Sequence, residues 1–256
     1  MDFLEPVSFG VNMRQKTINA VMAHAAAEYP KECCGVICQR SRVERYFPCR
    51  NLAAAATEHF HLSPEDYATA EDWGTVITIV HSHPDATTQP SELDKAQCDA
   101  TLLPWLIVSW PEGDIRVIQP RGELPLLERS FVLGHTDCYG LIMSYFRQTH
   151  GIELPDLRVD YPWWEDRYTD SLYHDRWFDC GFREFSGPSR PGDMAIMQVQ
   201  ANKWNHAGIL LEGNMLLHHL YGHLSQRVPY GGYWQERTVK VLRYHINDNA
   251  LTNEKI

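Results

Sequence analysis

The sequence predicts two consecutive domains, an α/β domain followed by an α+β domain. The chain has 256 residues, enough for two domains of ordinary size. Residues 119–130, QPRGELPLLERS, combine two prolines, a glycine and mixed charge, as linkers do. Helical and strand-like segments are mixed before this stretch, whereas one helix and then a run of strands follow it. We expect domains at residues 1–120 and 129–256, joined by a linker at 121–128.

The elements of the first domain follow from hydrophobic periodicity and from residues that cap helices. Helical periodicity after residue 12 stops at Pro30, and Ser63 and Ser91 each precede a short helical pattern. Two apolar runs about a Pro-Gly-Asp turn predict a hairpin. The expected elements are helices at 12–30, 63–74 and 91–102, strands at 32–39, 43–49 and 75–84, and a hairpin of residues 105–110 and 115–119.

The second domain is expected to begin with a helix at 137–151 that ends at Gly151. An aromatic-rich irregular stretch then continues to about residue 187. Apolar, β-branched segments after this stretch predict a sheet. Its expected strands are 193–199, 206–213, 214–220 and 224–230.

Composition excludes several classes of protein. The net charge is −10, with 33 acidic against 23 basic residues, which argues against nucleic acid as a partner. Residues 1–10 carry acids and lack the apolar run of a signal peptide, and the longest apolar runs are too short to span a bilayer. The seven cysteines are scattered and odd in number, unlike a disulfide framework. We therefore expect folding in a reducing cytoplasm.

A candidate metal site lies at the end of the strand at 75–84. Residues i and i+2 of a strand share a face, so His81 and His83 can present two imidazoles to one cation. Asp94, in the first turn of the next helix, can supply a third ligand. Three protein ligands leave a zinc position for water, whose pKa falls to about 7. The alternative is a structural role for the histidines and a capping box at Ser91.

These segments, HSHP at 81–84 and SELD at 91–94, resemble the JAMM/MPN metallopeptidases, and Glu32 in YPKECCG matches the upstream glutamate of that family. The resemblance implies Zn²⁺ held by His81, His83 and Asp94. It implies Glu32 as general acid/base and Ser91 as a hydrogen-bond donor to the developing oxyanion. The fold implied is a small α/β sandwich like that of the cytidine deaminases, and the activity implied is cleavage of peptide or isopeptide bonds.

A second candidate site begins at the helix at 137–151. Cys138 lies in its first turn, with Thr136 and Asp137 as candidate caps, and a helix N-terminus is expected to lower the pKa of the thiol. His206 begins one predicted strand and His218 lies on the next, so an antiparallel pair can place His218 behind His206. A packed, unreactive cysteine is the alternative.

The segments DCYGL, RPGDMAIM and HAGI, with His218 about a dozen positions later, resemble the NlpC-type cysteine peptidases, which have a papain-like α+β core. The resemblance implies Cys138 as nucleophile, His206 as base, His218 as orienting residue and the Cys138 N–H as an oxyanion donor. Its implied substrate is the peptide stem of peptidoglycan. We prefer His218 to His219 by spacing and expect His219 on the opposite face.

The remaining candidates are interpreted as structural. His59 and His61 form a second HxH pair, which alone carries little weight. The aromatics of 161–185 either line a substrate groove or pack against the sheet, and packing is at least as well supported. The cysteines interpreted as structural are Cys33, Cys34, Cys38, Cys49, Cys98 and Cys180.

A JAMM-like domain followed by an NlpC-like domain resembles the tail-assembly proteins of lambda-like phages, over nearly the whole chain. The resemblance implies a peptidase whose partners are peptidoglycan stem peptides and other phage tail-tip proteins. It implies synthesis in the host cytoplasm and action from the virion tail tip or during assembly. Two alternatives stay open: an assembly factor whose peptidases process tail proteins, and a bacterial two-domain peptidase unrelated to phage.

Overall fold

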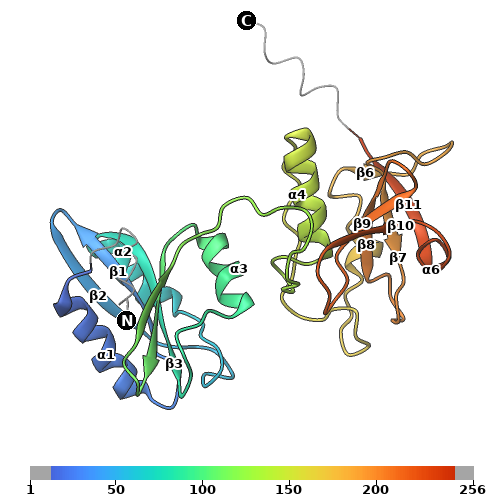
Figure 1. The fold of residues 1–256 in the computed structure, drawn as a ribbon. Helices are drawn as coiled ribbons and strands as arrows, with labels where there is room; N and C mark the ends of the chain where they lie inside the picture. Colours follow the sequence, from blue (N-terminus) through green and yellow to red (C-terminus); the bar gives the residue numbers. More distant parts are fainter. Residues whose placement is uncertain (1–12, 246–256) are drawn as a thin grey trace, which may run out of the picture. The chain divides into compact units, whose positions relative to one another are not determined.

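The computed structural model describes residues 13–245 (Figure 1). The chain divides into two compact units, Met1–Gly122 and Glu123–Ile256. The residues at 1–12, on which the expectation about a signal peptide rests, lie outside the described part. No helix among residues 13–245 is long and apolar enough to cross a membrane.

The first unit is built on a five-stranded mixed sheet with the strand order β2-β1-β3-β4-β5. The β3–β4 pair is parallel and the other neighbours are antiparallel. A parallel pair needs a crossover, which the helix α3 (Glu92–Thr101) between β3 and β4 provides. The strands are β1 (Cys34–Arg40), β2 (Val43–Cys49), β3 (Thr75–Pro84), β4 (Trp105–Trp110) and β5 (Ile115–Ile118).

Helices cover both faces of this sheet, so its central strands are buried on both sides. On β1, Ile37 packs in a cluster with Val21 of α1 (Gln15–Glu28), whereas Val36 packs with Ala70 of α2 (Pro64–Trp73) and with Cys98 of α3 (Glu92–Thr101). Neighbouring residues of β1 thus enter opposite cores, as the two-residue period of a strand requires. The predicted α/β sandwich is confirmed.

The helix starts follow the predicted caps. The hydroxyl of Ser63 accepts a hydrogen bond from the N–H of Asp66, and that of Ser91 accepts one from Asp94. Each bond satisfies one of the N–H groups that the first turn of a helix leaves without an intrahelical partner. The positions of α2 and α3, and hence of Asp94, are therefore set locally by sequence.

The second unit is an antiparallel six-stranded sheet, with the order β10-β9-β8-β7-β11-β6, and the helix α4 (Cys138–His150). Leu141 and Phe146 of α4 pack in one core with Ile196 and Ile209 of the sheet. The predicted helix and four predicted strands are confirmed. The strands are β6 (Phe182–Arg183), β7 (Met194–Met197), β8 (His206–Leu211), β9 (Met215–His218), β10 (Gln226–Pro229) and β11 (Thr238–Tyr244).

The structure adds elements that the sequence did not predict. β11 pairs with β7 and β6 and completes the sheet. The short helices α5 (Leu172–Asp175) and α6 (Tyr233–Arg237) are also new. The aromatic-rich segment at 152–187 contains α5 and β6 and is otherwise irregular, as expected. Trp163 and Tyr173 of this segment are buried in the same core as α4, which supports its packing role.

Candidate active sites

The end of β3 and the first turn of α3 bring the three candidate metal ligands together. The Nε2 atoms of His81 and His83 are 3.0 Å apart. The carboxylate of Asp94 faces both rings, with Oδ1 3.2 Å from Nε2 of His81 and Oδ2 3.5 Å from Nε2 of His83. One ligand atom from each residue lies within 4.8 Å of the others.

This geometry fits zinc. Nitrogen and oxygen ligands at about 2.0–2.1 Å from a tetrahedral zinc ion are separated from one another by about 3.3–3.4 Å. The observed separations of 3.0, 3.2 and 3.5 Å lie on both sides of this value. Burial lowers the pKa of His81, which favours the neutral imidazole that binds metal. Although burial acts to raise the pKa of Asp94, hydrogen bonds with His81 and His83 hold it well below the usual range.

The surrounding residues fix the two imidazole rings. Nδ1 of His83 lies 2.8 Å from the backbone oxygen of Thr87, so this nitrogen carries the hydrogen and Nε2 keeps its lone pair. Burial opposes charge on His83, but its hydrogen bonds with Asp94 and Thr87 raise its pKa overall. The ring of Phe60 stacks on His81 at 4.7 Å between centroids. Nδ1 of His81 is buried without a hydrogen-bond partner among the described residues.

Ser91 caps α3 and holds a candidate ligand at the same time. Its N–H and its hydroxyl both donate to Oδ2 of Asp94 at 2.7 Å, and its hydroxyl accepts from the Asp94 N–H at 3.0 Å. The capping box, which was the alternative interpretation of Ser91, is present. In this arrangement the hydroxyl is directed at the carboxylate and orients it.

Glu32 lies beside this cluster, two residues before the start of β1. Its N–H donates to the oxygen of Ala56 at 2.7 Å, and the Asn51 side chain donates to its carbonyl oxygen at 3.0 Å. The charges of His83 and Asp94 act on its carboxylate, which is buried. Burial raises the pKa of Glu32 to about 7. The structure thus places all five residues of the first candidate site together.

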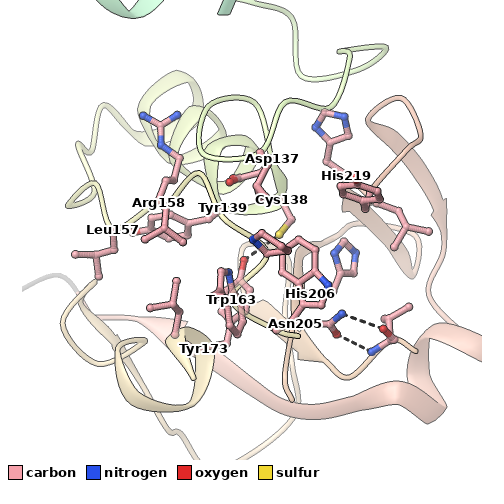
Figure 2. A pocket seen from close by; sticks show the side chains of 18 of the residues that line it. Asp137, Cys138, Tyr139, Leu157, Arg158, Trp163, Tyr173, Asn205, His206 and His219 are labelled. Carbon is pink, nitrogen blue, oxygen red and sulfur yellow. Dashed lines mark hydrogen bonds between the residues drawn. The ribbon is translucent and has the colours of Figure 1, made fainter. Parts of the chain in front are cut away.

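The second candidate site is a cavity of about 550 Å³ in the C-terminal unit (Figure 2). Cys138 of α4 and His206 of β8 both line it. The segment at 152–187 supplies much of the remaining wall, including Arg158, Trp163 and Tyr173. The aromatic segment therefore both packs in the core and lines the cavity.

The start of α4 positions Cys138. Asp137 is the cap, because its Oδ1 accepts from the N–H of Gly140 at 2.8 Å. The hydroxyl of Thr136 donates instead to the oxygen of Ser130, so Thr136 is not the cap. With Asp137 fixed, Cys138 is the first helical residue, where the backbone N–H has no intrahelical acceptor.

The expected lowering of the Cys138 pKa is wrong. Burial, followed by the charge of Asp137, raises the pKa of the thiol to about 12. Hydrogen bonds from the Tyr173 hydroxyl and from backbone N–H groups of Ala207 and Tyr139 act in the opposite direction but do not outweigh burial. The resting group is therefore a thiol rather than a thiolate.

The antiparallel pairing of β8 with β9 places His218 against His206. Gly208 lies opposite His218 in the register, and Nε2 of His206 is 3.0 Å from Nδ1 of His218. Burial, followed by the neighbouring histidines, lowers the pKa of His206 to about 3 and of His218 to about 4. Both imidazoles are therefore neutral at physiological pH.

The hydrogen bond between these rings restricts their tautomers. If Nδ1 of His206 accepts a proton, its Nε2 must carry a hydrogen and donate to Nδ1 of His218. Nε2 of His218 then carries the second hydrogen. This nitrogen is buried without a hydrogen-bond partner in the described part of the chain. The ring of Trp234 lies edge-on to His218 at 4.2 Å, a position that suits an N–H···π contact.

His219 takes a separate position, at the cavity wall. Its Nε2 lies 3.1 Å from the oxygen of His223, and its ring packs edge-on against Phe131 at 5.1 Å. In the described part of the chain His219 makes no hydrogen bond with His206, whereas His218 does. The choice of His218 over His219 as the partner of His206 therefore agrees with the geometry.

The structure also adds a residue that sequence patterns did not indicate. The hydroxyl of Tyr173 is 3.2 Å from Sγ of Cys138. Tyr173 is one of many aromatics in an irregular segment, so no spacing pattern distinguished it. His59 and His61 are exposed and outside the metal cluster, and all seven cysteines are free thiols.

Comparisons with known proteins match both halves of the chain. Residues 14–119 match the family of prokaryotic homologues of the JAB domain, and residues 128–243 match the NlpC/P60 family. The tail tip assembly protein K of Escherichia phage N15 is 83% identical over 232 residues, which cover 91% of this chain and 96% of the relative. That of Escherichia phage lambda is 34% identical over 184 residues, which cover 72% and 89%. The solution structure of a Desulfitobacterium hafniense protein aligns at 25% identity with a TM-score of 0.34, covering 43% of this chain and 91% of that one.

Proposed function

Because this chain belongs to the family of phage tail tip assembly protein K, with a JAB domain followed by an NlpC/P60 domain, we propose that it serves in phage tail-tip assembly and carries a cysteine peptidase that cuts peptidoglycan stem peptides. The observation that carries the peptidase proposal is that Cys138 and His206 line one cavity and that His218 lies behind His206, with Nε2 of His206 3.0 Å from Nδ1 of His218. The two relatives are phage proteins, which favours this setting over a bacterial two-domain enzyme.

The proposed reaction starts from a neutral Cys138 thiol and a neutral His206 imidazole. Nδ1 of His206 takes the thiol proton as Sγ of Cys138 attacks the scissile carbonyl carbon, and His218 holds the ring in the required tautomer. The Cys138 N–H, free of an intrahelical acceptor, donates to the oxyanion. The C–N bond breaks, the leaving amine takes the proton from His206, and water then hydrolyses the thioester.

For the JAB domain we propose a zinc site formed by His81, His83 and Asp94. Zn²⁺ in such a site polarises a carbonyl group and lowers the pKa of water. Glu32 accepts and returns a proton, a task for which a carboxyl pKa near 7 is suited. Ser91 orients Asp94 through its two hydrogen bonds to the carboxylate. A hydroxyl has one hydrogen, so to act as the proposed donor to the oxyanion it must turn away from Asp94, which the Ser91 N–H continues to hold.

A second candidate function is processing of phage tail proteins by one of these domains. The name of both relatives, tail tip assembly protein K, favours it. In this case the protein acts in the host cytoplasm during assembly. If it instead cleaves peptidoglycan, it also acts from the virion tail tip or after release from the host cell.

Complementation separates these functions. A phage that lacks its own copy of the gene is supplied with wild type, Cys138→Ala or Asp94→Ala. If the cysteine site serves only cell-wall cleavage, Cys138→Ala phages form complete tails, and their extracts release no peptides from peptidoglycan. If Cys138→Ala blocks tail assembly while purified wild type leaves peptidoglycan intact, the processing function is supported instead. The Asp94→Ala arm shows whether the proposed zinc site is needed for assembly.

A further inference from the structure

The sulfur of Cys138 has a hydrogen-bond partner in the aromatic segment. The hydroxyl of Tyr173 is 3.2 Å from Sγ. Backbone N–H groups of Ala207 and Tyr139 act on the thiol in the same direction as Tyr173, because they also favour its anionic form and lower its pKa. A buried anion needs such donors, because it has lost the hydrogen bonds of water. A thiolate has no hydrogen to give, so the hydroxyl of Tyr173 must be the donor once the sulfur is ionised.

Tyr173 is held in this position by its own packing. Its side chain is buried, and its ring lies edge-on to Trp163 at 5.8 Å between centroids. Both residues belong to the core that contains α4. The hydroxyl therefore has little freedom to leave the sulfur.

Lys203, on the connection between β7 and β8, fixes the segment that precedes Tyr173. Its ammonium lies 2.6–3.4 Å from four backbone oxygens, those of Trp163, Glu165, Tyr168 and Asp170. The next residue towards the N-terminus, Asn202, donates to the carboxylate of Asp166 at 3.1 Å. The irregular segment is thus tied to the strand that carries His206.

We propose that Tyr173 is a fourth residue of the cysteine site, whose hydroxyl stabilises the thiolate that forms when the thiol proton moves to His206. The proposal rests on the proposed role of Cys138 as the nucleophile. The proposal predicts the sign of the effect: without the Tyr173 hydroxyl, a smaller fraction of Cys138 is thiolate. If the ring only filled space, replacing the tyrosine by phenylalanine would leave the population of the thiolate unchanged.

Alkylation of Cys138 tests this directly. Wild type and Tyr173→Phe are treated with iodoacetamide between pH 7 and pH 9, and modification of the Cys138 peptide is followed by mass spectrometry. The phenylalanine keeps the ring and its packing but removes the donor. We expect the alkylation rate to fall about fivefold to tenfold at each pH, since the lower thiolate fraction is partly offset by the greater nucleophilicity of a more basic thiolate. An unchanged or faster rate would overturn the proposal.

Tyr161→Phe is the matched control. Tyr161 lies in the same segment, and its hydroxyl donates to Asp170 at 2.8 Å rather than to the sulfur. We expect this variant to alkylate at the wild-type rate, and equal melting temperatures for all three proteins would show that folding is intact. If Tyr161→Phe slows alkylation as much as Tyr173→Phe, the effect belongs to the segment and the proposal fails.

The alkylation assay needs no peptidase substrate. If the protein released no stem peptides, the proposed function would fail, but a slower alkylation of Tyr173→Phe would still support the bond to sulfur. If the protein released peptides but Tyr173→Phe were alkylated at the wild-type rate, the proposed function would stand and only the role of Tyr173 would be refuted.

Discussion

Acid should destabilise the C-terminal unit through three buried histidines. Burial lowers the pKa of His206 to about 3 and the pKa values of His218 and His219 to about 4. Unfolding returns each imidazole to a pKa of about 6.5. The unfolded chain therefore binds more protons than the folded one as the pH falls below 6.5. The stability contributed by these neutral histidines is complete above pH 6.5 and is lost as the pH falls towards 3–4.

The size of the effect follows from the same values. At pH 5.5 each unfolded histidine is about 90% protonated, whereas the folded ones remain almost wholly neutral. The loss relative to pH 8 is about 1.4 kcal/mol for each histidine, or about 4 kcal/mol for the three. A domain of this kind has about 5–15 kcal/mol of stability, so a loss of this size is easily measured.

Native-state hydrogen exchange measures this loss of stability, because it gives a free energy of opening for individual amides and so reports on each unit of the chain separately. The free energy of opening of the β8 and β9 amides is measured between pH 8 and pH 5.5, with the intrinsic exchange rates corrected for pH. His218→Gln should reduce the pH dependence by about one third, whatever it does to absolute stability. A total loss below about 1.4 kcal/mol would refute the inference that these histidines are buried in the neutral state.

The other predictions concern both sites. Wild type should bind about one zinc ion per chain by elemental analysis, and Asp94→Ala should lower zinc affinity by at least tenfold; equal zinc content would contradict the site. Glu32→Gln should keep the zinc, since Glu32 is not a proposed ligand. The kcat/KM of peptide release should be level from pH 9 to about 5, because His206 stays neutral; an acid limb near pH 6.5 would be inconsistent with this. Lys203→Met should speed hydrogen exchange at 163–170 and cost about 2–4 kcal/mol by leaving carbonyl groups unpaired.

Local signals explain why much of the fold and the metal cluster could be predicted. Ser63 and Ser91 are caps whose effect is confined to one helical turn, and the alternation of apolar residues identifies buried strands. The same local rules place His81 and His83 on one face and Asp94 in the first turn of α3. Only the approach of the end of β3 to the first turn of α3 depends on long-range packing.

Features that depend on tertiary contacts were missed or wrong. β11 was not predicted, because its charged residues, Lys240 and Arg243, interrupt the apolar pattern. The pKa of Cys138 was given the wrong direction, because a helix N-terminus is visible in the sequence and burial is not. Tyr173 reaches the sulfur through a segment that is held by Lys203 and by ring packing, and neither has a sequence signature.

We propose that the C-terminal unit is a peptidoglycan peptidase whose nucleophile is Cys138. The most direct test of this claim is release of muropeptides from purified Gram-negative peptidoglycan, followed by mass spectrometry, for wild type, Cys138→Ala and Cys180→Ala. Cys180 is a second free thiol at the cavity and serves as the matched control. We predict release by wild type and Cys180→Ala and none by Cys138→Ala. Equal release by wild type and Cys138→Ala, or release by none of the three, would contradict the claim.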